Sequence, residues 1–254
     1  MKIIADTNIW YSLGQDNDLF KKVEELLICP TWINIVELSK TENVVDKEDF
    51  TRLAIQKMFH YKSNVIVDSP FIYLSKLKTK DEKVELDSFI SDCLLFTERF
   101  AQGDKIDLEK QSQYYDWINK HRDNVTTLCD WFNEKSDGIK KKVNKKTHRK
   151  LDTFEITATF IHKIVELMTK GEVNLYDFDF EQIELFWRTI DQFFKELELS
   201  GMKMQPNDWF DFTQLAYVQP GDLFWTKEKR WIRIIENIGL QDYLYQETQD
   251  NLLS

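Results

Sequence analysis

The sequence predicts an α/β protein in which a parallel sheet, flanked by helices, is formed by both ends of the chain and interrupted by a large all-α insertion. Short apolar runs that stop at polar residues lie near both ends. Residues 71–200 instead show charged stretches with apolar residues at helical spacing. Strands at both ends imply that the two ends meet in one sheet. We therefore expect an α/β core of residues 1–70 and 201–254 and a helical insertion of residues 71–200.

The first part of the chain predicts a strand followed by helical sequence. Residues 2–5 are apolar, rich in β-branched side chains, and stop at the polar Asp6-Thr7-Asn8 loop, as expected for a buried strand. Residues 9–13 are apolar and begin a helix. The cluster of polar residues at 14–18 predicts a turn, and residues 19–27 have apolar side chains at helical spacing.

The next elements repeat this strand and helix pattern. Residues 28–30 form a second short strand, which its proline ends. Thr31 or Asn34 is the expected cap of the helix that follows. Residues 50–61 predict an amphipathic helix, and residues 64–68 form another strand-like run.

The middle of the chain predicts a succession of helices without proline. Its few glycines are expected at helix ends. The helical stretches are residues 86–100, 108–121, 125–132, 154–168 and 180–199.

The last part of the chain returns to an α/β pattern. The Asn207-Asp208 pair is expected to cap a helix that runs to residue 218. A Pro-Gly turn then leads into a strand of residues 222–226, and residues 231–238 predict a final helix.

Composition excludes several classes of protein. The chain has 254 residues, a hydrophobic fraction of 42% and an aromatic fraction of 14%, which is enough apolar material for a folded core. Its formal charge of −10 and pI of about 5.0 argue against a protein covered in basic side chains for nucleic-acid binding. The charge does not exclude an enzyme that presents carboxylates to metal ions.

The cysteines and the apolar runs indicate the cellular compartment to expect. The three cysteines are far apart, and none belongs to a CxxC pair, so we expect buried free thiols in a reducing compartment. No run approaches the roughly 20 apolar residues of a membrane span, and no signal sequence is evident. The expectation is a cytoplasmic protein without a membrane partner. Phosphate-binding glycine loops and a Gly-x-Ser-x-Gly elbow are also missing from the sequence.

Acidic residues stand at the ends of several predicted elements. Asp6 ends the first strand, Glu37 lies on the helix after the second, and Glu228 follows the last strand by two residues. Asp208 and Asp211 are three residues apart on one helix and therefore share a face. Because the carboxyl ends of parallel strands open onto one crevice, these acids are expected to meet there.

Clustered carboxylates need a counter-charge. At about 4 Å, two of them repel by about 4 kcal/mol at an effective dielectric constant near 20. Protonation or a bound divalent cation relieves this repulsion. Ligand sets made only of oxygen suit Mg²⁺ or Mn²⁺, and a metal-bound water can attack a phosphodiester. The residues therefore predict metal-dependent phosphodiester hydrolysis.

Four segments together resemble the PIN-domain (PilT N-terminus) ribonucleases. They are Ile4-Ala5-Asp6-Thr7-Asn8, Ile35-Val36-Glu37-Leu38, Asn207-Asp208-Trp209-Phe210-Asp211 and Phe224-Trp225-Thr226-Lys227-Glu228. The resemblance implies a PIN-like parallel sheet and acids that bind Mg²⁺ or Mn²⁺. It also implies an endoribonuclease that hydrolyses RNA, often as a toxin neutralised by a protein antitoxin.

The resemblance also assigns residues. Asp6 matches the first acid of the family, Glu37 the second, and Asp208 or Asp211 the third. Thr7 and Asn8 match the polar neighbours of the first acid.

The end of the motif departs from the family. Thr226 matches the Thr or Ser before the last acid, but Glu228 stands where the family more often has Asp. Asp222, at the start of the same strand, is the alternative fourth ligand. The helical insertion is also much longer than a minimal PIN domain carries.

One dense basic segment stands out in this acidic chain. It spans residues 140–150 and is expected to attract the RNA backbone. The lysines proposed to contact phosphate are Lys140, Lys141, Lys142, Lys145 and Lys146.

Two other functions fit the same residues. One is a PIN-like binding or scaffold module with little or no turnover, in which the helical insertion contacts a protein. The other is a nuclease directed at DNA, because an acidic cluster does not reveal the sugar of its substrate. A homodimer is compatible with the sequence in each case.

Overall fold

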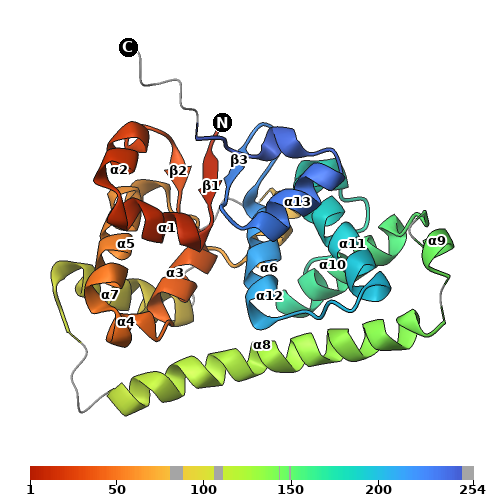
Figure 1. The fold of residues 1–254 in the computed structure, drawn as a ribbon, viewed down its shortest axis with the longest axis horizontal. Coiled ribbons are helices and arrows are strands. Elements are labelled where there is room, and N and C mark those ends of the chain that lie inside the picture. The colour runs from red at the N-terminus through yellow and green to blue at the C-terminus, as the bar shows by residue number, and fades with distance from the viewer. Residues whose placement is uncertain (81–87, 106–110, 143, 149, 248–254) are drawn as a thin grey trace.

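The computed structural model describes residues 1–80, 88–105, 111–142, 144–148 and 150–247. Three short parallel strands lie between two groups of helices, and one long helix runs beneath both groups (Figure 1). Small parts of the predicted helices 86–100 and 108–121 fall outside the described residues, as do Val143 and Arg149 of the basic segment. The predicted α/β class is confirmed as a small parallel sheet within a mostly helical protein.

The sheet has the strand order β2-β1-β3. It consists of β1 (Ile3–Ala5), β2 (Ile28–Cys29) and β3 (Leu223–Trp225). The two ends of the chain meet in it, because Ile3 pairs with Ile28 on one side and with Leu223 on the other. The predicted strands 2–5, 28–30 and 222–226 are therefore present.

The predicted strand at residues 64–68 is not formed. A single parallel bridge joins Ile66 to Thr31, and the Ile66 amide donates to the Pro30 carbonyl at 2.8 Å. One bridge holds this segment beside the end of β2 without extending the sheet.

Both faces of the sheet are buried. Side chains alternate across a strand, so Ile3 and Ala5 join one hydrophobic cluster and Ile4 joins the other. On β3, Trp225 belongs to the first cluster and Phe224 to the second. Parallel strands covered on both faces read as continuous apolar runs, which is why these three runs were recognisable in the sequence.

The first group of helices packs around the face of Ile3 and Ala5. Its members are α1 (Thr7–Gln15), α2 (Asn17–Val23), α3 (Trp32–Ser39), α4 (Asn43–Asp46), α5 (Glu48–His60), the 3-10 turn η1 (Lys62–Asn64) and α7 (Ser88–Gln102). Thr31 caps α3 in a capping box with Asn34, so both predicted cap residues take part.

The predicted turn at residues 14–18 begins later than expected. Gly14 lies inside α1, and Asp16 caps α2. A Cβ atom on Gly14 would come within 2.7 Å of the Ala54 backbone nitrogen. This glycine therefore permits the close packing of α1 on α5.

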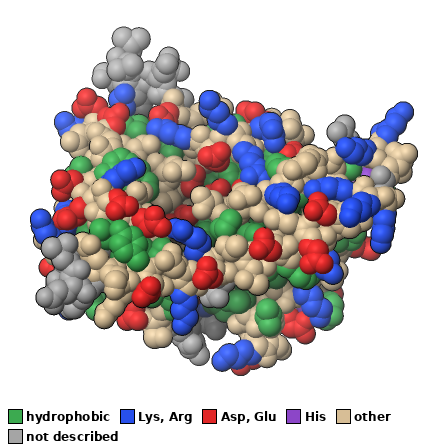
Figure 2. Space-filling view, turned by 60° about the horizontal axis from the view of Figure 1, so that its bottom comes forward, with side chains coloured by type: hydrophobic (Ala, Val, Ile, Leu, Met, Phe, Trp, Pro, Cys, Tyr) green, Lys and Arg blue, Asp and Glu red, His purple; other side chains and the backbone are tan. Residues whose placement is uncertain are grey.

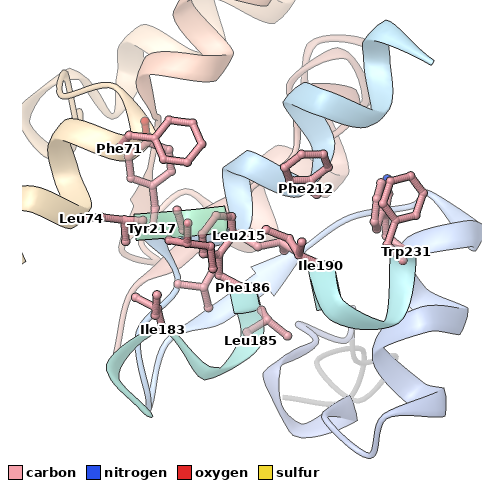
Figure 3. Close-up of a cluster of buried hydrophobic side chains, with 14 of the residues drawn as sticks. Phe71, Leu74, Ile183, Leu185, Phe186, Ile190, Phe212, Leu215, Tyr217 and Trp231 are labelled. Carbon is pink, nitrogen blue, oxygen red and sulfur yellow. The ribbon is translucent and has the colours of Figure 1, made fainter. Parts of the chain in front are cut away.

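The second group of helices packs around the face of Ile4 and Phe224. Its members are α6 (Pro70–Thr79), α9 (Lys145–His148), α10 (Phe154–Met168), η3 (Phe180–Ile183), α11 (Glu184–Leu199), α12 (Pro206–Gln214), η4 (Leu215–Tyr217), α13 (Lys229–Asn237) and η5 (Gln241–Tyr243). Figure 3 shows part of its core, in which Phe186 and Ile190 of α11 lie close to Phe212 and Leu215.

Helix α8 (Gln111–Lys140) joins the two groups (Figure 1). The sequence predicted separate helices at 108–121 and 125–132, but α8 runs through both. Its buried Tyr114 and Ile118 belong to the first hydrophobic cluster, and Val125 and Phe132 belong to the second.

Residues 71–200 do not pack as a separate body. Helix α7 lies against α3 and α5, and α11 lies against α12 and α13, so the middle of the chain completes the cores formed by its two ends. Cys29, Cys93 and Cys129 are buried, as expected, and none of them forms a disulfide within the described residues. Within the described part of the chain, every helix is too short or too polar to span a bilayer.

Candidate acidic active site

A cleft of about 690 Å³ opens at the carboxyl ends of the strands. Its walls come from both groups of helices, and α8 borders it with Ile118, Arg122 and Val125. Four carboxylates from separate elements line it: Asp6, Glu37, Asp211 and Glu228. The predicted convergence of acids from both ends of the chain is therefore present in the geometry.

Asp6 follows β1 and precedes the first turn of α1. Its carboxylate is buried and accepts a hydrogen bond of 2.8 Å from the Thr226 hydroxyl, while its amide donates to the Trp225 carbonyl. Burial raises the pKa of Asp6, the bond from Thr226 opposes this, and the charge of Glu228 raises the pKa further. Asp6 thus joins the ends of β1 and β3.

Glu37 lies on α3 and accepts a hydrogen bond of 2.5 Å from the Thr7 hydroxyl. The Asn34 side-chain amide donates to that hydroxyl at 3.0 Å and to the Ala5 carbonyl at 3.1 Å. Burial raises the pKa of Glu37 to about 7, the bond from Thr7 opposes the rise, and the charge of Asp6 adds to it. A chain of hydrogen bonds therefore fixes Glu37 relative to the end of β1.

Asp211 faces the cleft, and Asp208 does not line it. Burial raises the pKa of Asp211 well above its ordinary value, and the charges of Asp6 and Glu37 raise it further. The Trp231 indole nitrogen donates to the Asp211 carboxylate at 2.9 Å.

Asp208 has a different partner. Its carboxylate is buried, pairs with the Arg230 guanidinium and accepts the Gln205 amide at 2.7 Å, which closes the capping box of α12. The helix therefore begins after Gln205 rather than at the predicted Asn207-Asp208 pair. Of the two candidates for the third acid, Asp211 is the one placed with Asp6 and Glu37.

Glu228 and Asp222 lie at opposite ends of β3. Glu228 lines the cleft, and its amide donates to the Thr226 hydroxyl at 3.0 Å. Asp222 precedes the strand, accepts the Lys2 backbone amide at 3.0 Å and forms an ion pair of 3.6 Å with the Lys2 ammonium. Asp222 is thus separated from the other acids by the length of the sheet, which corrects its expected role as an alternative fourth ligand.

The predicted supporting residues all lie beside the acids. Thr226 connects Asp6 to the Glu228 backbone, and Thr7 connects Glu37 to Asn34. Asn8 lines the cleft and is exposed.

Two buried amides were missed as site residues by the sequence reasoning. The side chains of Asn34 and Gln214 both donate to the carbonyl of Ala5, at 3.1 and 2.5 Å. This carbonyl ends β1 beside Asp6, so the two amides fix the strand end that presents the first acid. The sequence signal was the polar Asn34 inside the apolar sequence of α3. The sequence analysis assigned this residue only to capping.

Two cations in the cleft were also missed. Lys40 ends α3, and Arg122 approaches from α8, where it forms an ion pair of 2.8 Å with Glu42. Nothing local in the sequence brings α8 to the acids, because this contact depends on packing between distant segments.

The residues of the cleft fit a hard divalent cation by donor type, since every candidate ligand is an oxygen. Among residues 1–80, 88–105, 111–142, 144–148 and 150–247, no three His, Cys, Asp or Glu side chains are arranged to hold a metal ion. Asp6, Glu37 and Asp211 are instead bonded to Thr226, Thr7 and Trp231. A cation would have to draw these carboxylates toward one point.

The basic segment lies away from the cleft. Lys140 is eighteen residues beyond Arg122 on α8, a rise of about 27 Å. Lys141, Lys142, Lys145 and Lys146 are exposed around α9, and basic side chains gather at that end of the molecule (Figure 2). Lys140 itself pairs with Asp137 at 3.0 Å. None of these lysines therefore lines the cleft with the acids.

Comparison of this chain with protein-family models, with curated proteins and with solved structures finds no match.

Proposed function

We propose that the protein is a Mg²⁺- or Mn²⁺-dependent endoribonuclease. The observation that carries the proposal is the set of four carboxylates from four separate elements on one cleft, three of which have pKa values raised mainly by burial. Carboxylates withdrawn from water without a cationic partner are costly, and a divalent cation is the counter-charge that suits them.

Asp6, Glu37 and Asp211 are the residues proposed to hold the cation, and Glu228 is the fourth acid of the cleft. When bound, the cation supplies an activated water and stabilises negative charge on the phosphate. Thr226 and Thr7 hold Asp6 and Glu37 in place by the hydrogen bonds described above. The burial of Asp6 keeps bulk water away from the first ligand.

The resemblance to PIN ribonucleases supports the same residues, because its motifs coincide with the acids that line the cleft. The proposal is limited to RNA phosphodiester hydrolysis. A protein antitoxin is not needed for it.

Cleavage of a labelled single-stranded RNA, with Mn²⁺ or with EDTA, tests the proposal. Asp6→Asn, Glu37→Gln and Asp211→Asn should each reduce cleavage at least about a hundredfold, while EDTA should abolish it. Asp222→Asn is the matched control, since it makes the same chemical change at the other end of the sheet. Cleavage that survives EDTA or the three substitutions would refute the proposal, and a matched DNA strand tests the sugar preference.

A binding module without turnover is the second candidate. The described carboxylates are not arranged as a ready metal site, and this observation favours it. Titration with Mn²⁺ separates the two: a binding module would show no Mn²⁺ affinity and no cleavage of RNA.

A further inference from the structure

Lys40 lines the acidic cleft and has no carboxylate partner among the residues that the structure describes. It directly follows α3, three residues after Glu37, and lines the same cleft. Its ammonium nitrogen lies 4.0 Å from the ring centroid of Phe89 and 4.2 Å from that of Trp117. Two aromatic faces therefore hold the ammonium of this cleft-lining lysine, and neither ring lines the cleft itself.

Several other half-buried lysines of the described chain have carboxylate partners. Lys76 contacts Asp68 at 2.6 Å, and Lys195 contacts Asp191 at 2.8 Å. For Lys40, no carboxylate of the described residues lies within 4.0 Å, although Glu37 and Glu42 are close in sequence. Burial lowers the pKa of Lys40 to about 8, which leaves most molecules charged at pH 7.

A half-buried cation that has no anionic partner is stabilised when it binds an anion. Cation–π contacts stabilise the charged ammonium by about 0.5–2 kcal/mol. They supply no negative charge, so the ammonium can still bind an anion. Lysine contacts phosphate as a point charge and needs no paired geometry. The nearby Arg122, by contrast, is already paired with Glu42.

We propose that Lys40, held between Phe89 and Trp117, binds a backbone phosphate of single-stranded RNA beside the phosphodiester at the acids. The assignment rests on the proposed ribonuclease function and names the residue that positions its substrate. It gives the acidic cleft a cation of its own, which the basic segment at α9, outside the cleft, does not supply.

Binding of a labelled single-stranded RNA at a series of salt concentrations tests the assignment. Asp211→Asn is present in every binding sample, so that the RNA is not cleaved. Lys40→Met should weaken binding about tenfold and make the slope of log affinity against log salt shallower by about 0.7, the value for one phosphate on a single strand. Lys40→Arg should restore most of the affinity and the slope.

Lys57→Met is the matched control. Lys57 also lies over an aromatic ring, with its nitrogen 3.8 Å from the centroid of Phe20, but it does not line the cleft. Its replacement should change neither affinity nor salt slope. Circular dichroism of each variant checks that the fold is retained.

Cleavage kinetics in the presence of Mn²⁺ separate the two levels of the proposal. If otherwise unmodified protein cleaves RNA and Lys40→Met leaves KM and the salt slope unchanged, the Lys40 assignment is wrong and the ribonuclease proposal stands. A protein that neither binds nor cleaves RNA would overturn both. A raised KM with the shallower slope, rescued by Lys40→Arg, supports both.

Discussion

Glu37 shows how a single side chain couples the cleft to pH. Its half-buried side chain lines the cleft and accepts the Thr7 hydroxyl, yet its pKa is raised to about 7. The desolvation of the charged form therefore outweighs the hydrogen bond that stabilises it. In the absence of a cation, Glu37 is half protonated near neutral pH.

The raised pKa gives a stability prediction with a definite sign. Between about pH 4.5 and pH 7, folded Glu37 holds its proton while the unfolded chain has released it, so stability in EDTA should fall as pH rises. The slope is at most about 1.4 kcal/mol per pH unit for this residue. Glu37→Gln should therefore flatten the dependence and be more stable than the unmodified protein at pH 8.

Urea denaturation in EDTA at several pH values measures this effect. Glu25→Gln, at an exposed residue outside the cleft, is the control and should leave the profile unchanged. An identical pH profile for Glu37→Gln and the unmodified protein would contradict the raised pKa.

Asn34 and Gln214 both fix the end of β1, but only Asn34 also positions Glu37. Each donates to the Ala5 carbonyl, but Asn34 also donates to Thr7, which in turn donates to Glu37. Asn34→Ala and Gln214→Ala should each cost about 1–3 kcal/mol of unfolding free energy, the usual effect of leaving a buried polar group without its partner. Both variants should reduce RNA cleavage, because both amides fix the end of β1 beside Asp6. Asn34→Ala should reduce it more, because it also removes the bond to the Thr7 hydroxyl that positions Glu37.

Denaturant unfolding and cleavage rates on the same samples measure both effects. Equal reductions of cleavage in the two variants would mean that Thr7 does not depend on Asn34.

At the scale of elements, the packing of α1 on α5 depends on Gly14. The added Cβ of Gly14→Ala would meet the backbone of α5 at 2.7 Å, and a backbone cannot rotate away as a side chain can. We expect a destabilisation of about 1–3 kcal/mol, the usual cost of overpacking.

Gly138→Ala is the matched comparison. Gly138 lies in α8, and an added Cβ has nothing within 4 Å. This variant should be stabilised by up to about 1 kcal/mol, because alanine favours the helix over glycine. Thermal unfolding of both variants checks the pair, and a neutral Gly14→Ala would show that α1 can move away from α5.

The length of helix α8 was not predictable from its own sequence. Sequence analysis predicted two helices there, at residues 108–121 and 125–132. In the structure the helix is continuous, and its buried Tyr114, Ile118, Val125 and Phe132 follow helical spacing along one face, the first two in one hydrophobic cluster and the last two in the other. One face of α8 thus packs against both groups of helices with no break in the helix.

For the whole molecule, metal binding should appear as an increase in stability. A cation that binds the folded protein at a hundred times its Kd stabilises it by about 2.7 kcal/mol, which corresponds to roughly 5–10 °C in Tm for a chain of this size. Mn²⁺ should raise the Tm of the unmodified protein and of Asp222→Asn. Asp211→Asn should abolish the rise, and an unchanged Tm in all three would exclude the metal site.

The basic segment gives a prediction about RNA bound outside the cleft. Replacing Lys140, Lys141, Lys142, Lys145 and Lys146 with Gln should weaken RNA binding and reduce its salt slope by about 0.7 for each phosphate that these lysines no longer neutralise. The Mn²⁺-induced rise in Tm should remain, because none of these lysines lines the cleft and Lys140 lies about 22 Å along α8 beyond Val125, the last residue of that helix in the cleft. An unchanged salt slope would identify the segment as solvated surface.

Local sequence patterns were sufficient to predict many features of this protein. The three buried strands, the acids at their carboxyl ends and the buried thiols follow from runs of side chains only a few residues long. Such runs are readable because a strand covered on both faces must be apolar along its whole length. The stop at Asp6 and the cap at Thr31 are equally local.

Tertiary structure decided what distant segments do to one another. Asp208 and Asp211 share a helix, but only the position of Arg230 on α13 turns Asp208 into a buried ion pair and leaves Asp211 facing Asp6. Asp222 and Glu228 stand at opposite ends of β3, and Lys40 meets Trp117 because α8 borders the cleft. Local sequence specifies an element through interactions over a few residues, whereas a site is completed by packing between elements far apart in the chain.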